Sequence, residues 1–151
     1  MLEGELEYRK GNYDEAFAAL RRSIEVDVNL PYDEPWGWMQ PTRHAYGALL
    51  LEQGHVTEAE ATYRAGRGRD ATIPRSQQHP QNVWSLHGHH ECLERLGKHE
   101  EAAVVEQQLR FAKARADVPI NASCFCRLSS NAVGEGCCAE GACGDACCGS
   151  T

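Results

Sequence analysis

The sequence predicts an all-α protein of about three helical hairpins, followed by a tail of different composition. Two observations lead to this prediction. One six-residue pattern occurs at residues 11–16, 54–59 and 97–102, always with Gly first, Glu fifth and Ala sixth, and each copy is displaced by 43 residues from the last. Apolar residues also recur at helical spacing on both sides of each copy, as they do in amphipathic helices.

Each copy of the pattern predicts a tight turn between two helices, because Gly supplies the turn geometry at small steric cost and Ala lets the helices approach closely. The first hairpin is predicted around Gly11, the second around Gly54 and the third around Gly97. The apolar stripes before the three turns are Leu2 and Leu6, then Tyr46, Leu49 and Leu50, then Leu86, Leu93 and Leu96. Those after the turns are Tyr13, Phe17, Leu20 and Ile24, then Val56, Ala59 and Tyr63, then Ala102, Val105 and Leu109.

Two segments separate the hairpins. Residues 28–41 contain three prolines and two tryptophans, and residues 66–81 contain two prolines among polar residues. Because proline interrupts helices, both segments are predicted to be connections.

The three copies resemble the tetratricopeptide repeat family. Its helix-turn-helix unit of 34 residues has small residues before the turn, Gly at the turn, an aromatic residue two positions later and Ala five positions later. In the third copy His99 replaces the aromatic residue and His90 the small one, and the two connections absorb the longer displacement. The matching positions are Gly4, Gly11, Tyr13, Ala16 and Leu20, then Gly47, Leu50, Gly54, Ala59 and Tyr63, then Leu93, Gly97 and Ala102.

The resemblance implies a helical solenoid domain over residues 1–116. The helical pattern stops there, and residues 117–151 are predicted to be a separate, disordered Cys-rich tail. The latter part of the chain is also similar to the C-terminal portion of longer, uncharacterised tetratricopeptide proteins, which implies the end of a larger solenoid or a shortened relative. Hairpins of a solenoid bury their apolar faces against neighbours, so Leu2 and Leu6 are expected to be exposed on the uncapped first hairpin. Self-association, an upstream segment or a partner helix would each cover them.

The resemblance further implies a non-catalytic interaction module whose groove, lined by the first helix of each hairpin, binds a peptide or helix of a protein partner. The connection at residues 31–41 has the aromatic composition of a binding hot spot. The competing interpretations are an ordinary solvated helix face and an aromatic connection folded between the hairpins, and Trp84 is interpreted as core. The predicted partner-binding residues are Trp36, Trp38, Arg43, His44, Leu51, His87 and Glu91.

Composition and motifs argue against other classes of function. The formal net charge is −7 with scattered basic residues, which does not favour nucleic acid. No apolar run is long enough for a membrane span and the first residues are charged, so a cytoplasmic protein is expected. The chain has no phosphate loop, dinucleotide fingerprint or nucleophile elbow, and its histidine group at residues 87–90 is not a zincin motif. We therefore expect neither enzymatic activity nor a cofactor.

The tail suggests an alternative function. Seven of the eight cysteines fall in the last 28 residues, and from residue 129 onward the chain has too little apolar surface to order itself, so disorder is predicted. Several thiolates on a flexible backbone could converge on a soft ion such as Zn(II) or Cu(I), while disulfides, lipidation and an idle tail compete with this interpretation. The Cys124-Phe125-Cys126 stretch could alternatively pack against the last hairpin. The candidate ligands are Cys124, Cys126, Cys137, Cys138, Cys143, Cys147 and Cys148.

Overall fold

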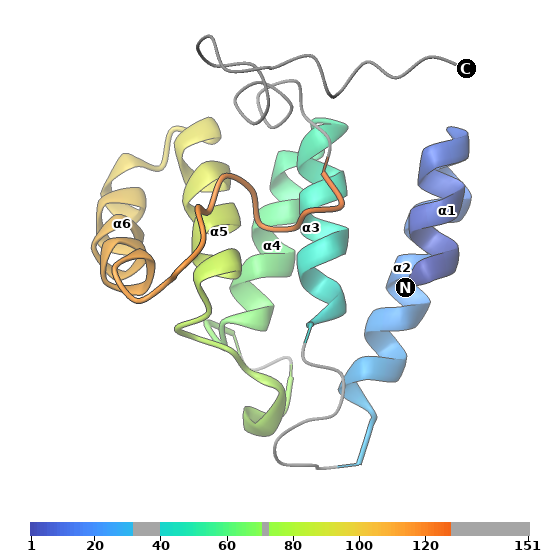
Figure 1. The fold of residues 1–151 in the computed structure, drawn as a ribbon, viewed down its shortest axis with the longest axis horizontal. Helices are drawn as coiled ribbons and strands as arrows, with labels where there is room; N and C mark the ends of the chain where they lie inside the picture. Colours follow the sequence, from blue (N-terminus) through green and yellow to red (C-terminus); the bar gives the residue numbers. More distant parts are fainter. Residues whose placement is uncertain (32–39, 71–72, 128–151) are drawn as a thin grey trace, which may run out of the picture.

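The structure, a computed structural model, describes residues 1–31, 40–70 and 73–127. Over these residues the chain forms six α-helices, one short 3-10 helix and no strand (Figure 1). The all-α prediction is therefore confirmed for the described part of the chain. The elements are α1 (Leu2–Lys10), α2 (Tyr13–Val28), α3 (Thr42–Glu52), α4 (Val56–Gly66), η1 (Arg75–Gln77), α5 (Val83–Arg95) and α6 (His99–Lys113).

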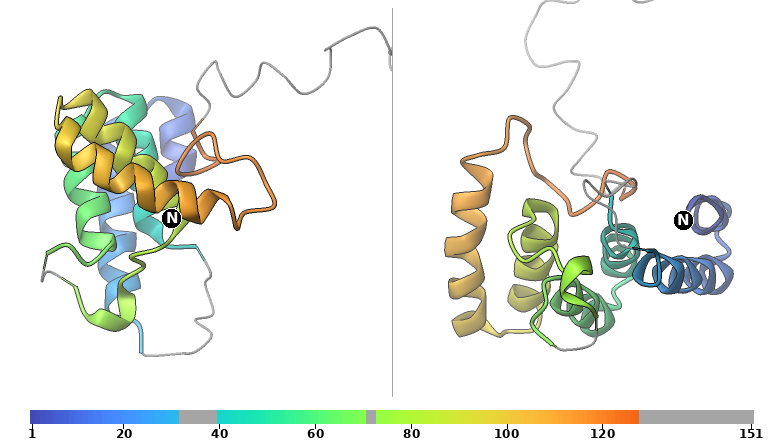
Figure 2. Two further views of the ribbon diagram at one scale, coloured as in Figure 1. Left: turned by 90° about the vertical axis from the view of Figure 1, so that its left-hand side faces the viewer. Right: turned by 90° about the horizontal axis from the view of Figure 1, so that it is seen from below.

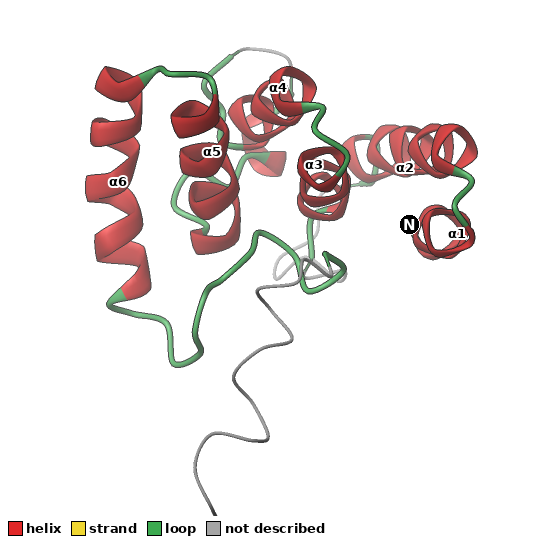
Figure 3. Ribbon diagram, turned by 90° about the horizontal axis from the view of Figure 1, so that it is seen from above, coloured by secondary structure: helices red, strands yellow, loops and turns green. Residues whose placement is uncertain are grey.

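The helices form three consecutive hairpins. α1 packs on α2, α3 on α4 and α5 on α6, while α4 against α5 and α2 against α3 join one hairpin to the next. Seen from above, the hairpins follow one another from α1 at one end to α6 at the other (Figure 3). The second and third hairpins share the more extensive contact, and the first stands at one edge.

The three predicted turns close in the same way. At each of them the Gly has a positive φ, between 70° and 86°, a conformation that Gly adopts without strain. The residue after each Gly donates its backbone N–H to the carbonyl five residues earlier at 2.9 Å, which closes the end of the preceding helix. The repeated pattern thus encodes the turns as expected, and the Ala that ends each copy is fully buried. The residues concerned are Gly11, Gly54 and Gly97 at the turns and Ala16, Ala59 and Ala102 at the contacts.

The core has two parts. The larger one joins the first two hairpins and continues to Cys92 of α5, and the smaller one lies between α5 and α6 around Leu86 and Leu93. Tyr63 of α4 is the largest fully buried side chain and lies where α3, α4 and α5 meet. At the free edge Leu2 and Leu6 are 72% and 50% exposed, as the sequence predicts for an uncapped first hairpin.

The chain does not leave the helical body after α6. Residues 117–127 turn back without regular secondary structure and run across α5 and α3 toward α1 (Figures 1 and 2). Ile120 and Ser123 of this segment are buried. The domain boundary at residue 116 and the disorder predicted for the tail stay predictions, and residues 128–151 of the tail lie outside those described. Among the described residues, no helix combines the length and apolar character needed to cross a membrane.

Candidate functional site

The first helices of the three hairpins, α1, α3 and α5, form one face of the molecule, here called the front face. Residues 117–127, here called the crossing segment, lie on it, between α6 and α1 (Figure 2). Every hairpin contributes to the contact, as the following interactions show. The front face is therefore a surface on which an irregular stretch of polypeptide is already bound.

Tyr63 belongs to α4, and its side chain is long enough to place its hydroxyl at the front face. Its ring passes between α3 and α5 at Gly47 and Gly88, where an added Cβ would lie 2.5 Å and 2.3 Å from the ring Cζ atom. At the front face the Tyr63 hydroxyl and the Ser123 hydroxyl form a buried hydrogen bond. Burial raises the pKa of Tyr63 far above its ordinary value, so the phenol stays neutral. The two glycines thus let a residue of α4 provide a polar anchoring point on the front face.

Charged side chains hold the far end of the crossing segment. Arg127 Nη1 lies 2.7 Å from Glu91 Oε2 of α5, and Arg95 also binds Glu91 at 2.6 Å. Arg9 of α1 donates a hydrogen bond from its guanidinium to the carbonyl of Cys126. The segment is thereby anchored to α5 by a side chain and to α1 by its backbone.

The crossing segment contains a disulfide between Cys124 and Cys126. Both residues are buried on α3, where Gln40 Nε2 lies 3.7 Å from Cys124 Sγ. Disulfide sulfurs are not thiolates, so these two residues could serve the predicted metal site only after reduction. The remaining candidates, Cys137, Cys138, Cys143, Cys147 and Cys148, lie outside the described residues.

Within the described ranges, no three His, Cys, Asp or Glu side chains gather in a way that could hold a metal ion. Cys92 is fully buried, and this burial raises its thiol pKa to about 12. Soft-metal binding by the tail thus stays an alternative prediction.

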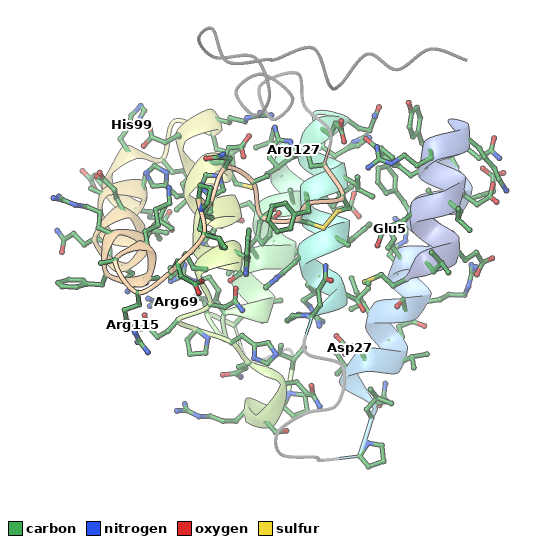
Figure 4. All side chains as sticks on the ribbon, viewed as in Figure 1. Glu5, Asp27, Arg69, His99, Arg115 and Arg127 are labelled. Carbon is green, nitrogen blue, oxygen red and sulfur yellow. A yellow bond between two sulfur atoms is a disulfide. The ribbon has the colours of Figure 1, made fainter. Side chains whose placement is uncertain are left out.

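A cavity of about 740 Å³ remains open between α1, the start of α3, the start of α5 and the crossing segment. Trp84 and Phe125 form part of its wall, with their rings edge to face at a centroid distance of 5.1 Å. Asn82 fixes the start of α5, because its side-chain oxygen accepts the N–H of Trp84 at 2.9 Å. Glu5 lines the opposite side, and Figure 4 shows it between α1 and α3.

His44 lies at the cavity wall contributed by α3. It is buried, and desolvation together with the nearby His79 lowers its pKa to about 3. The imidazole is therefore neutral near pH 7, and it joins the neutral polar side chains of Gln40, Asn82 and Ser123 in a cavity wall that also includes Glu5 and Arg9.

The predicted partner-binding residues separate into four groups: three lie at the front face, one is buried, one lies elsewhere and two are outside the described residues. His44 lines the cavity, Glu91 binds Arg127, and His87 forms a hydrogen bond with the backbone of Asn121 in the crossing segment. Leu51 is 1% exposed, so this chain's own helices cover the side chain predicted to contact a partner.

Arg43 lies away from the cavity. Its Cδ would be 3.3 Å from a Cβ at Gly66 of α4, and its charge interacts with Asp27 and Asp70. The remaining two candidates, Trp36 and Trp38, lie outside the described residues.

Sequence reasoning missed three important members of the site. Trp84, interpreted as core, is only partly buried and lines the cavity, while Arg9 and Phe125 were not selected at all. One signal was available for Trp84, because it precedes His87 by three and Glu91 by seven positions and so shares their face of α5. No local pattern marks Arg9 or Phe125, since their roles arise from contact between the two ends of the described chain.

The histidines at residues 87–90 of α5 do not form one site in the structure. His89 is buried behind the front face, where its Nδ1 lies 2.5 Å from Arg67 Nη1 and its Nε2 lies 3.3 Å from Glu60 Oε1. Desolvation and the charge of Arg67 lower the pKa of His89 to about 4. Arg67 also donates a hydrogen bond to Gln108 of α6, so this polar network joins α4, α5 and α6 and has a structural role.

The front face is the part of this structure best suited to holding another molecule. It combines an anchored polypeptide segment, an adjacent cavity and side chains of both charges. No protein family, curated protein or solved structure matches the chain. Function is consequently inferred from the helical hairpins and from the geometry of the front face.

Proposed function

We propose that this chain is a non-catalytic protein–protein interaction module of the tetratricopeptide kind, which binds a non-helical peptide of a partner protein on its front face. Three hairpins with the same Gly turn, repeated at a constant displacement, support this class. In a stacked arrangement of hairpins, equivalent helices lie beside one another and create an extended surface for a partner.

The observation that carries the proposal is the crossing segment. An irregular stretch of this chain is held on the front face by a backbone hydrogen bond from Arg9, a buried hydroxyl contact with Tyr63 and an ion pair with Glu91. The same groups can hold a stretch of another chain, provided that it offers a backbone carbonyl to Arg9, a hydroxyl to Tyr63 and a basic side chain to Glu91. The cavity beside it, at about 740 Å³, is of the size typical of ligand sites.

The experiment is selection of short random peptides by the purified chain, followed by affinity measurement on substituted chains. Selected peptides should bind at least about tenfold more weakly to Trp84→Ala or Arg9→Ala, because Trp and Arg at the centre of a contact typically contribute most of the binding energy. Phe111→Ala is the matched control, since Phe111 is another aromatic residue, 78% exposed on α6 and remote from the cavity. It should leave the affinity unchanged.

The proposal fails if selection yields no binding peptide, or if Trp84→Ala and Arg9→Ala bind the selected peptides as well as Phe111→Ala does. Thermal unfolding of each variant, followed by circular dichroism, separates lost binding from lost folding.

A further inference from the structure

The crossing segment shows which side chains the front face accepts, beginning with Ser123. This side chain is 1% exposed and its hydroxyl contacts the buried hydroxyl of Tyr63. If an apolar residue replaced Ser123, the Tyr63 hydroxyl would lose this partner inside the protein, which is unfavourable. Because the residue is this enclosed, a large side chain would have to displace atoms that surround it. This position therefore favours a small residue with a hydroxyl.

Two positions later the face accepts an aromatic residue. Phe125 packs edge to face on Trp84, a geometry favoured by aromatic pairs. Phe125 nevertheless remains 77% exposed, although the cavity lies directly beside it. The aromatic contact in the segment thus uses only part of the surface that the cavity offers.

A further two positions on, the face accepts a basic residue. The side chain of Arg127 is 10% exposed and binds Glu91, which Arg95 holds in place. However, Arg127 Nε is buried without a hydrogen-bond partner among the described residues. An unmet buried donor weakens binding. The segment therefore fits the face incompletely at this position as well.

The segment is also tethered, because α6 precedes it by only a few residues. A short tether typically gives a bound segment an effective concentration of the order of millimolar. An incompletely fitting segment can thus stay bound within its own chain, while a better-fitting peptide can displace it.

Resting on the proposed function, we infer that the front face recognises a peptide with a small hydroxyl residue, an aromatic residue two positions later and a basic residue two positions after that. Ser123, Phe125 and Arg127 occupy these positions in cis, and a segment of another protein with the same pattern displaces them. The crossing segment thereby lowers the apparent affinity for every competing peptide by the same factor, so that only well-fitting partners bind.

The test uses a synthetic disulfide-bonded peptide of residues 119–127 as the probe, with a scrambled peptide as control. Its affinity is measured for the full chain and for the full chain carrying Phe125→Ala and Arg127→Ala together, which removes the aromatic and the basic side chain of the pattern in cis. The double variant should bind the probe at least about tenfold more tightly, because the tethered competitor is weakened. Adding Glu91→Gln to the double variant should reverse most of this gain. Adding Glu94→Gln, a change at an exposed carboxylate on the same helix away from the segment, should not.

Hydrogen exchange provides a second measurement that needs no substitution. The wild-type chain is saturated with a tightly binding peptide from the random-peptide selection. The amides of residues 121–127 should then lose protection from exchange, while those of the helices keep theirs. Equal probe affinity for wild type and double variant, absence of probe binding to the double variant, or unchanged protection would each overturn the inference.

If selected peptides bind but none of these effects is observed, the inferred peptide pattern is wrong and the proposed function is retained. A dimer that dissociates in the double variant would show that the segments are exchanged between two copies, and would overturn the cis assignment.

Discussion

Tyr63 connects the packing of the helices to the front face. Its ring needs the space at Gly47 and Gly88, and its hydroxyl anchors Ser123 after passing between the two helices. Both glycines lie within helices, where Gly is less favourable than Ala by roughly 1 kcal/mol. Gly is nevertheless needed at both positions, because the Tyr63 ring occupies the space that the methyl group of Ala would fill.

Alanine at either glycine should therefore destabilise the fold. In Gly47→Ala and Gly88→Ala the new Cβ would meet the Tyr63 ring at 2.5 Å and 2.3 Å, so the ring or a helix must move. The expected loss in free energy of unfolding is about 1–3 kcal/mol for each, measured by chemical denaturation.

The matched control is Gly66→Ala, whose Cβ would meet only the flexible Arg43 side chain at 3.3 Å, and it should change stability by less than about 0.5 kcal/mol. In a Tyr63→Ala background, Gly88→Ala should no longer be unfavourable. Equal losses for all three glycines would contradict this account of Tyr63.

At the scale of elements, α3 is central and α1 lies at the edge. α3 buries nine residues from Thr42 to Leu51, whereas α1 buries only Gly4 and Tyr8. Beyond its own hairpin, α1 is held mainly by polar contacts, including the Tyr8 hydroxyl with Glu52 and Gln53.

Amides of α1 should consequently exchange with solvent faster than those of α3, by at least about tenfold in native conditions, because local opening of α1 exposes little apolar surface. Hydrogen exchange read by mass spectrometry compares interior amides of the two helices. Tyr8→Phe removes the contacts with Glu52 and Gln53. It should accelerate amide exchange in α1 and leave amide exchange in α5 unchanged. Equal protection of α1 and α3 would show that the first hairpin opens only with the whole fold.

At the scale of the whole molecule, the fold was largely predictable and the site only in part. Gly turns and helical stripes are local signals, so the hairpins could be read from the sequence. Leu51 was assigned to a partner surface because periodicity cannot show that α3 is covered on almost every side. The position of Phe125 depends on the return of the chain across α5 and α3, which brings together residues far apart in sequence and leaves no local pattern.

Buried neutral histidines make the stability of the whole molecule depend on pH. The pKa values of His44 and His89 are lowered to about 3 and about 4, so both stay neutral in the folded chain while they bind a proton in the unfolded chain below about pH 6.5. The stability that these neutral histidines contribute is therefore fully present above pH 6.5 and is lost as pH falls toward the folded pKa values.

Between pH 7.5 and 5, His44 alone should account for a loss of about 2 kcal/mol in the free energy of unfolding. Urea denaturation across this range, where the buried Glu60 with its lowered pKa stays ionised, should show a shallower decline for His44→Gln than for wild type. Parallel declines would mean that His44 takes up a proton in the folded chain, and that the cavity wall beside it admits water.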